Sequence, residues 1–264
     1  MRRFLYISPF FPPIARVGAL RPLKFLRHLD GHGWAAVVLC DLWPGASVDA
    51  RLLDAIPDST VVIRDYSNRA TDAGARLADD PDSFPEPDEN VVQPEPRPSP
   101  GWFARREWLP LGEATRHNAH ALVSAHRAIQ AHACEAIMVN ADPVAALVVG
   151  ERLARETRLP LIADLRDPWG PCELRRPLRP FYTRWIEDRC ERRVVTRAAR
   201  VILNTETTRD DYARQFKDLE PGKFITIRNH GDPDLIDSGD DFRAEFSRFT
   251  ILFLGSFSRF VRPA

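Results

Sequence analysis

Three charged residues and a tryptophan follow closely after a short apolar run in the second half of the chain. The apolar run is Leu161 to Ala163, and the residues that follow it are Asp164, Arg166, Asp167 and Trp169. If the run is a buried parallel strand, these side chains lie at its carboxyl end, where doubly wound sheets bind ligands. The segment therefore predicts a binding or catalytic site. The alternative is an Asp–Arg pair that only fixes a loop, because structural ion pairs are common.

A second candidate is the proline-rich loop from Ser8 to Arg21, which contains Gly18. The loop joins a first apolar strand to a first helix, at the same expected edge of the sheet. The N-terminus of that helix offers amides to an anion, and a glycine lets the anion approach the backbone. A rigid turn before an ordinary helix explains the same residues. The loop has no Gly-x-Gly-x-x-Gly pattern, which counts against a nicotinamide-dependent dehydrogenase.

The elements that would position these residues alternate between strand and helix. Apolar and β-branched runs predict strands at Phe4 to Ile7, Ala35 to Leu39, Val61 to Ile63, Ala136 to Val139, Leu161 to Ala163 and Val201 to Leu203. Three- and four-residue apolar spacing predicts helices at Leu20 to Leu29, Glu113 to Ala131, Val144 to Arg155, Tyr182 to Ala198 and Thr207 to Phe216. This order is typical of an α/β fold with a doubly wound, Rossmann-like parallel sheet.

Two changes in composition indicate how the chain is divided. Residues 79–100 are acidic and rich in proline, so we expect a mobile surface loop inside the first domain. A turn-rich polar stretch begins at Asn229 and precedes a new apolar run, Phe249 to Phe257. We therefore predict a first domain over 1–235, and a linker with the first strand of an incomplete second domain over 236–264.

Overall composition excludes several classes of function. The 264 residues include 37 basic and 37 acidic side chains, so there is no global positive field of the kind that indicates a nucleic-acid binder. The four cysteines are scattered, which fits a reducing, cytoplasmic location. The apolar run at the N-terminus is too short for a signal peptide. No metal site is expected, because acidic or cysteine ligands at helical spacing do not complete the histidines of one predicted helix, His117, His120, His126 and His132.

Four segments, in order along the chain, resemble the glycosyltransferase family 4 enzymes. The first is Ser8-Pro9-Phe10-Phe11-Pro12-Pro13 with Gly18 and the Leu29 to Trp34 segment. The second is Leu165-Arg166-Asp167-Pro168-Trp169, which is similar to an Asp-Phe-Arg-Asp-Pro-Trp motif of one branch. The third, Ile227 to Asp232, resembles the interdomain segment of the family. The fourth, Phe253-Leu254-Gly255-Ser256-Phe257, resembles the entry to its second domain.

The resemblance implies the N-terminal, acceptor-side half of a GT-B fold, in which two Rossmann-like domains face each other across a cleft. It implies transfer of a sugar from a nucleotide-sugar donor to a saccharide or lipid-linked acceptor, with retention at the anomeric carbon and without metal or other cofactor. Gly18 would admit the donor diphosphate or sugar, and Arg21 would brace the first loop. Asp167 would be catalytic, and the other expected donor or acceptor contacts are Asp164, Arg166, Trp169, Asn229, Gly231 and Gly255.

Two departures from the family limit this reading. The phosphate clamp and paired glutamates of the family lie in the second domain, beyond the part present here, so we expect this chain to be incomplete as an enzyme. In the interdomain segment, His230 stands where a glycine is expected, and Gly231 is shifted by one position. The alternatives are therefore a non-catalytic or split acceptor-binding module, with the donor domain on a separate chain, and a nucleotide-sugar 2-epimerase of the same fold.

A dense group of arginines lies between Arg175 and Arg200. Such a surface could hold the protein at the inner face of a membrane through anionic lipid. The alternative is a solvated helix face whose arginines pair with Glu187, Asp188 and Glu191. Because the second domain is incomplete, we also expect exposed apolar surface and self-association.

Overall fold

The computed structural model describes residues 1–41, 46–67, 110–141, 143–170, 179–229 and 248–250. The chain divides into two compact units, Met1–His230 and Gly231–Ala264. The expected loop at 79–100, the linker, and the expected second-domain strand from residue 251 onward lie outside the described residues. The fold described below is therefore that of the first unit.

The first unit is built on one parallel sheet of seven strands in the order β3-β2-β1-β4-β5-β6-β7. The strands are β1 (Arg2–Ile7), β2 (Trp34–Leu39), β3 (Val61–Ile63), β4 (Ala136–Asn140), β5 (Leu161–Leu165), β6 (Arg200–Leu203) and β7 (Phe224–Thr226). The order reverses at β1, which pairs with β2 on one side and β4 on the other. The predicted α/β, doubly wound architecture is confirmed.

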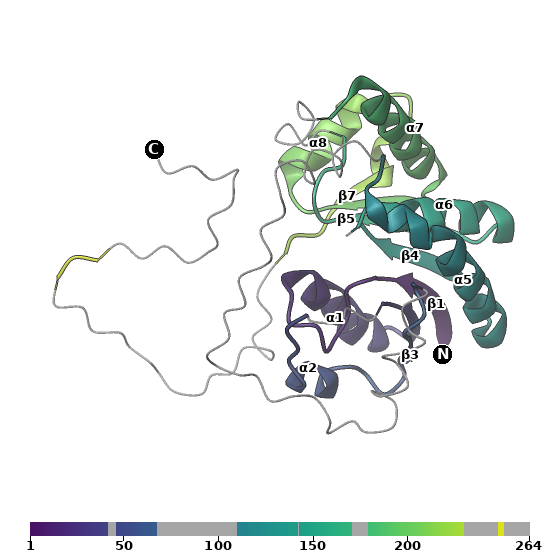
Figure 1. The fold of residues 1–264 in the computed structure, drawn as a ribbon, viewed down its shortest axis with the longest axis vertical. Coiled ribbons are helices and arrows are strands. Elements are labelled where there is room, and N and C mark those ends of the chain that lie inside the picture. The colour runs from purple at the N-terminus through teal and green to yellow at the C-terminus, as the bar shows by residue number, and fades with distance from the viewer. Residues whose placement is uncertain (42–45, 68–109, 142, 171–178, 230–247, 251–264) are drawn as a thin grey trace. The chain divides into compact units, whose positions relative to one another are not determined.

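Helices connect the strands in the alternation that the sequence indicates (Figure 1). They are α1 (Val17–Asp30), α2 (Arg51–Asp54), α5 (Asn118–His132), α6 (Ala145–Thr157), α7 (Phe181–Arg197) and α8 (Glu206–Gln215), with short 3-10 turns at Glu113–His117 and Pro221–Lys223. All five predicted helices are present. Among the described residues, the sequence missed the short α2, the 3-10 turn Pro221–Lys223 and the edge strand β7.

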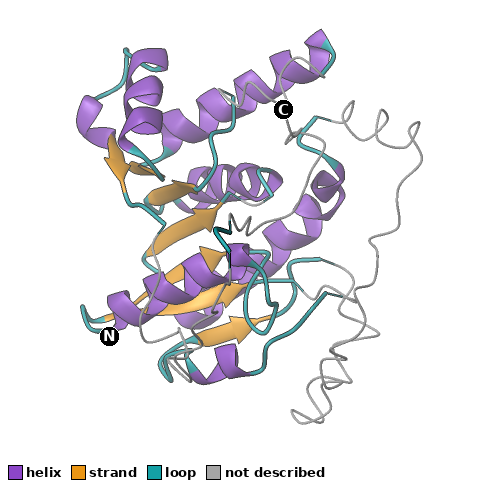
Figure 2. Cartoon of the chain, turned by 90° about the vertical axis from the view of Figure 1, so that its left-hand side faces the viewer, coloured by secondary structure: helices purple, strands orange, loops and turns teal. Residues whose placement is uncertain are grey.

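Side chains alternate between two faces of the sheet, and each face has its own core. Leu5 and Ile7 of β1 belong to the larger core, which also contains apolar residues of α5, α6, α7 and α8. Phe4 and Tyr6 belong to the smaller core, together with Leu26 of α1. Figure 2 shows the strands side by side as one sheet with helices packed against it. The larger core, over the central strands, supplies most of the apolar burial that drives folding.

Gly150 allows α6 to lie close to the sheet. A Cβ atom at this position would lie 2.4 Å from Cγ2 of Val139 in β4, well inside the van der Waals limit. A glycine inside a helix normally weakens it. Here the close contact between α6 and β4 explains its presence.

Candidate functional site

The centre of the candidate site is a buried ion pair between Arg21 of α1 and Asp164 of β5. Arg21 donates from Nε to Oδ2 of Asp164 at 2.8 Å and from Nη2 to Oδ1 at 2.7 Å. Arg21 is 6% exposed and Asp164 is fully buried. Two parallel hydrogen bonds fix both the position and the orientation of the guanidinium group. The pair therefore joins the start of the first helix to the carboxyl end of a central strand.

Arg21 also holds the segment that leads out of the first unit. Its Nη1 donates to Oδ1 of Asn229 at 2.8 Å, and its Nη2 donates to the carbonyl oxygen of Ile227 at 3.0 Å. The sequence predicted that Arg21 braces the first loop. The structure shows instead that its described hydrogen bonds go to β5 and to the interdomain segment.

Burial and charge fix the protonation states around this pair. Burial alone would lower the pKa of Arg21, but the hydrogen bonds and negative charge of Asp164 raise it. The guanidinium therefore stays protonated, and Asp164 is its counter-ion. Burial, followed by the charge of Asp164, raises the pKa of Tyr6 well above its usual value, although the charge of Arg21 and the nearby side chain of Asn140 oppose this shift. Tyr6 is therefore a neutral phenol beside the ion pair.

Arg64, which the sequence analysis did not single out, braces the first loop. Its Nη2 donates to the carbonyl oxygen of Pro12 at 2.7 Å. Within the loop, the hydroxyl of Ser8 donates to the carbonyl oxygen of Phe10 at 2.8 Å. Gly18 is buried in the first turn of α1, so the helix begins earlier than predicted and the glycine belongs to its N-terminus.

Arg166 and Asp167 form a second, more exposed pair after β5. The two side chains are 3.0 Å apart, between Nη2 of Arg166 and Oδ2 of Asp167. Arg166 is 18% exposed, whereas Asp167 is 74% exposed. The carboxylate of Asp167 is thus open to solvent, unlike that of Asp164, whose two oxygens both accept hydrogen bonds from Arg21. Of the two aspartates, Asp167 is the one that can meet an incoming ligand.

The backbone after this pair is held by two helices. The amide of Trp169 donates to the hydroxyl of Tyr212 in α8 at 2.9 Å, and that hydroxyl donates to Oε1 of Glu191 in α7 at 2.5 Å. The amide of Gly170 donates to the same oxygen at 3.0 Å. Burial, then the charge of Glu191, raises the pKa of Tyr212 well above its usual value, which keeps its proton available. Trp169 itself is buried.

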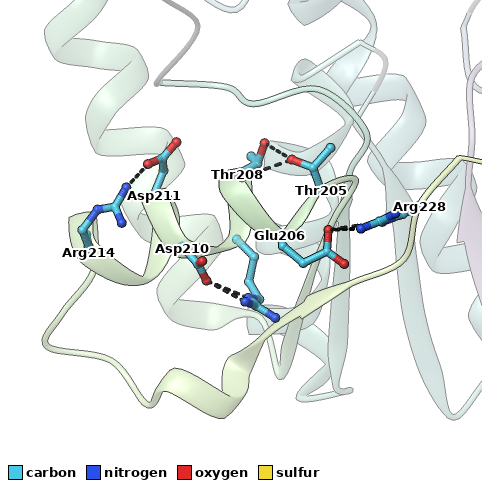
Figure 3. Close-up of polar contacts among 8 residues, drawn as sticks. Thr205, Glu206, Thr208, Asp210, Asp211, Arg214 and Arg228 are labelled. Atoms are coloured by element: carbon cyan, nitrogen blue, oxygen red, sulfur yellow. Dashed lines mark hydrogen bonds and ion pairs between the residues drawn. The ribbon is translucent and has the colours of Figure 1, made fainter.

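The interdomain segment is tied to the first unit by side chains on both sides. Arg228 Nη2 pairs with Oε2 of Glu206 at 2.6 Å, and the amide of Asn229 donates to Oδ1 of Asn204 at 2.6 Å. Figure 3 shows Glu206 beside the N-cap of α8, where Thr205 accepts a hydrogen bond from the amide of Thr208. Hydrogen bonding to Arg228 lowers the pKa of Glu206.

The structure thus brings together three of the residues predicted from sequence, Arg21, Asp164 and Asn229. It places Arg166, Asp167 and Trp169 on the loop directly after the same strand. Gly231 and Gly255 lie outside the described residues. Missed by the sequence analysis were Tyr6, Asn140, Arg64, Glu191 and Tyr212. Asn140 carried a usable signal, because it is a polar residue at the end of a buried strand, as Asp164 is.

Histidines of the α5 region bind carboxylates. His120 Nε2 lies 2.8 Å from Oδ1 of Asp65, and His126 Nε2 lies 2.7 Å from Oε2 of Glu156. Within the described part of the chain, there is no cluster of three or more side chains that could ligate a metal. The same residues include no helix that is both long and apolar enough to cross a membrane.

Comparison with known proteins gives the chain a family and confirms its fold. The family of glycosyl transferase 4-like domains matches residues 18–230. A sucrose-phosphate synthase from Thermosynechococcus elongatus has a similar structure, with a TM-score of 0.51 and 11% sequence identity over 86% of this chain and 48% of that one. A UDP-glucosyltransferase from Polygonum tinctorium also has a TM-score of 0.51, with 14% identity over 92% of this chain and 55% of that one. These similarities show a Rossmann-like domain of the GT-B type.

A third structure is less similar, and the chain again covers about half of its length. A UDP-GlcNAc 2-epimerase from Neisseria meningitidis has a TM-score of 0.45 and 12% identity over 86% of this chain and 45% of that one. The chain thus spans about half the length of these structures. No curated protein matched it in sequence. Since the family match covers most of the first unit, including Arg21, Asp164 and Asn229, the chain belongs to the glycosyl transferase 4-like domain family.

Proposed function

We propose that this chain provides the acceptor-side domain of a glycosyltransferase, which transfers a sugar from a nucleotide-sugar to a saccharide or lipid-linked acceptor. One observation carries the proposal. The family match spans residues 18–230, and within it the residues predicted for the site converge at the carboxyl end of β5 and the start of α1. In doubly wound sheets, this edge is where ligands bind.

The N-terminal turn of α1 suits a phosphate group. It contains no acidic residue, and its N-cap, Arg16, has an extended backbone. Free amides and the positive end of the helix dipole favour an anion there, as they do in many phosphate-binding proteins. In the proposed reaction the diphosphate charge is met by such groups, without a metal, and the sugar keeps its anomeric configuration.

Asp167 is the proposed catalytic residue because its carboxylate is exposed and held by Arg166. The buried Asp164 has a positioning role. It orients Arg21, which in turn fixes Asn229 and the backbone of Ile227. The proposed location is cytoplasmic, with peripheral contact between the 175–200 region and the membrane.

A second candidate is an acceptor-binding module that works with a donor domain on a separate chain. The observation that favours it is that Arg21, Asp164 and Asn229 come together within the first unit alone. In that case the purified chain binds acceptor but does not turn over donor.

The test is transfer of labelled sugar from a panel of nucleotide-sugars to saccharide and lipid-diphosphate acceptors. Loss of a catalytic acid or base commonly slows a reaction by about 10²–10⁴-fold, and we expect this for D167N. The matched control is D210N, because Asp210 also pairs with the arginine that precedes it, Arg209, at 2.7 Å. Acceptor binding without transfer indicates the module. The absence of both transfer and acceptor binding overturns both candidates.

A further inference from the structure

The first turns of α7 expose three large aromatic side chains to solvent. Phe181 is 77% exposed, Tyr182 41% and Trp185 57%. Phe181 and Trp185 are four residues apart, so they lie on the same side of the helix. The guanidinium of Arg189, one further turn along, lies 4.4 Å from the centre of the Trp185 ring. We call Phe181, Tyr182, Trp185 and Arg189 the aromatic face of α7.

Exposed aromatic groups of this size have a cost, because each leaves a large apolar area in water. Single exposed apolar residues need no explanation, but a cluster of three over little more than one helical turn does. The rings of Phe181 and Tyr182 contact each other edge to face, with centroids 6.1 Å apart. Phe181 and Tyr182 thus form one patch, and Trp185 lies one turn further along the same side of the helix.

Two glutamates that could neutralise the arginines of α7 point into the protein. Glu187 is 6% exposed, and it accepts hydrogen bonds from the amide of Leu111 and from Arg179. Glu191 is fully buried and binds Gly170 and Tyr212. The alternative from sequence, in which Glu187, Asp188 and Glu191 brace the arginines of this region, thus holds for Glu187, which pairs with Arg179, whereas Glu191 binds Gly170 and Tyr212. Their carboxylates are committed to the interior.

The outward side of α7 is left with an excess of positive charge. Arg192 pairs with Asp218 at 2.6 Å, and Arg193 pairs with Glu151 at 3.1 Å. Arg189 contacts Trp185 through its ring, which leaves the charge of the guanidinium uncancelled. Arg184, three residues after Phe181 and directly before Trp185 in the sequence, adds a further charge to this part of the helix. Besides the two buried glutamates, α7 contains one acidic residue, Asp188, whose single negative charge does not balance Arg184 and Arg189. Aromatic and cationic groups are thus combined on one surface.

The topology of the sheet sets the location of this surface. α7 follows β5, and a helix that follows a parallel strand begins near the carboxyl edge of the sheet. The start of α7 is therefore on the side of the sheet where β5 ends, as are Asp164 and Asp167. The residues 171–178 between them lie outside the described part of the chain.

We propose that the aromatic face of α7 binds the surface of an anionic lipid bilayer. Tryptophan and tyrosine favour the boundary between headgroups and acyl chains, and Phe181 extends the apolar contact. Arg184 and Arg189 attract the anionic headgroups, each contributing roughly a five-fold gain in affinity near such a surface. The link to catalysis rests on the proposed function: a lipid-linked acceptor would reach Asp167 from the membrane on which α7 lies.

The test is co-sedimentation of the purified chain, at low salt, with phosphatidylcholine vesicles that contain either no phosphatidylserine or about 30% of it. That amount gives the vesicles a strongly negative surface. We expect binding to the anionic vesicles that weakens as salt is added. The variant F181A/W185A should lower the vesicle affinity about ten-fold or more, and R189E roughly 25-fold, because reversing a charge removes one attraction and adds one repulsion.

Matched controls separate this surface from general effects. F249A removes an exposed phenylalanine outside α7, and R155E reverses an exposed arginine on α6; both should leave vesicle binding within about two-fold of the unmodified chain. All five side chains replaced in the test variants and controls are exposed, so folding should be preserved, as circular dichroism would confirm.

The proposal is overturned by no binding to anionic vesicles at low salt, by equal binding to pure phosphatidylcholine, or by equal losses in the controls. Loss of self-association in F181A/W185A without any vesicle binding would assign the face to a second copy of the chain and also overturn it. Vesicle binding without sugar transfer supports the membrane-binding proposal and counts against the proposed function. Sugar transfer to a saccharide without vesicle binding supports the proposed function and overturns the membrane-binding proposal.

Discussion

Arg21 and Asp164, 143 residues apart in the sequence, are joined by hydrogen bonds in the interior, the shortest of them 2.7 Å between Nη2 and Oδ1. Their contact connects the first helix to the fifth strand. Through the same guanidinium, Arg21 also reaches Ile227 and Asn229. One side chain thus links segments from the beginning, the middle and the end of the first unit.

Replacing Arg21 alone should destabilise the protein strongly. R21A leaves the carboxylate of Asp164 buried without its counter-ion, and we expect a loss of about 3–5 kcal/mol in the free energy of unfolding by urea at pH 7. The double variant R21M/D164L should lose less free energy of unfolding, since it removes both charges and leaves neither one buried without a partner. The control is R2A, because the Arg2–Glu135 pair is exposed and pairs of that kind contribute about 0–1 kcal/mol. Equal losses in R21A and R2A would contradict this account.

The ion pair between Arg228 and Glu206 should make the stability of the fold depend on pH. Hydrogen bonding to Arg228 lowers the pKa of Glu206 from its ordinary value of 4.5. Because the pKa is lower in the folded state, the ionised carboxylate stabilises the fold above pH 4.5. This contribution is lost as the pH falls through the lowered pKa.

The measurement is thermal unfolding of E206Q and of the unmodified chain from pH 7 down to pH 3. We expect E206Q to be the less stable at pH 7 and the difference to shrink below pH 4.5. R228Q removes the other partner and should show the same trend. A difference for E206Q that is constant over the whole range would refute the assignment.

Adding a methyl group at Gly150 should disturb the contact between α6 and β4. The Cβ of G150A would lie 2.4 Å from Cγ2 of Val139, so a fully packed region must shift. Overpacking of this kind costs about 1–3 kcal/mol. The matched control is G31A, where the nearest atom to the new Cβ is the carbonyl oxygen of His28 at an ordinary 3.7 Å. The free energy of unfolding measured in urea should be lower in G150A and little changed in G31A.

Removing the hydroxyl of Tyr212 should loosen the loop after β5. Y212F deprives the amide of Trp169 of its acceptor and Glu191 of a donor, both in the interior. Buried groups left unsatisfied cost about 1–3 kcal/mol. Y66F is the control, because the buried Tyr66 hydroxyl has no hydrogen-bond partner among the described residues. Hydrogen exchange at Trp169 and Gly170 should speed up in Y212F and stay unchanged in Y66F. If the two variants behave alike, the hydroxyl of Tyr212 does not hold the loop.

Elements with long apolar runs or clear helical spacing could be predicted from the sequence, and those that depend on neighbours could not. β7 has only three residues at the edge of the sheet, and pairing with β6 makes it a strand. The start of α1 was placed too late because Val17 and Gly18 are poor helix formers.

The contacts of the candidate site could be predicted from the sequence only in part, for a similar reason. Asp164 and Asp167 stand out because they follow a buried strand, and Arg21 and Asn229 were singled out from the resemblance and its neighbouring motifs. Glu191 and Tyr212 lie inside helices whose exposed side also carries charges. Only tertiary packing distinguishes a buried glutamate that holds a loop from one that faces solvent, so no local pattern identifies them.

The two faces of the sheet carry different kinds of interaction. The larger core lies under α5 and α6, whereas Tyr6, with Asp164 and Arg21 around it, lies on the face that α1 covers. The larger apolar core and the buried ion pair therefore lie on opposite sides of the same strands. A replacement confined to the larger core changes the packing on one face of β5 and leaves the partners of Arg21, on the other face, in place.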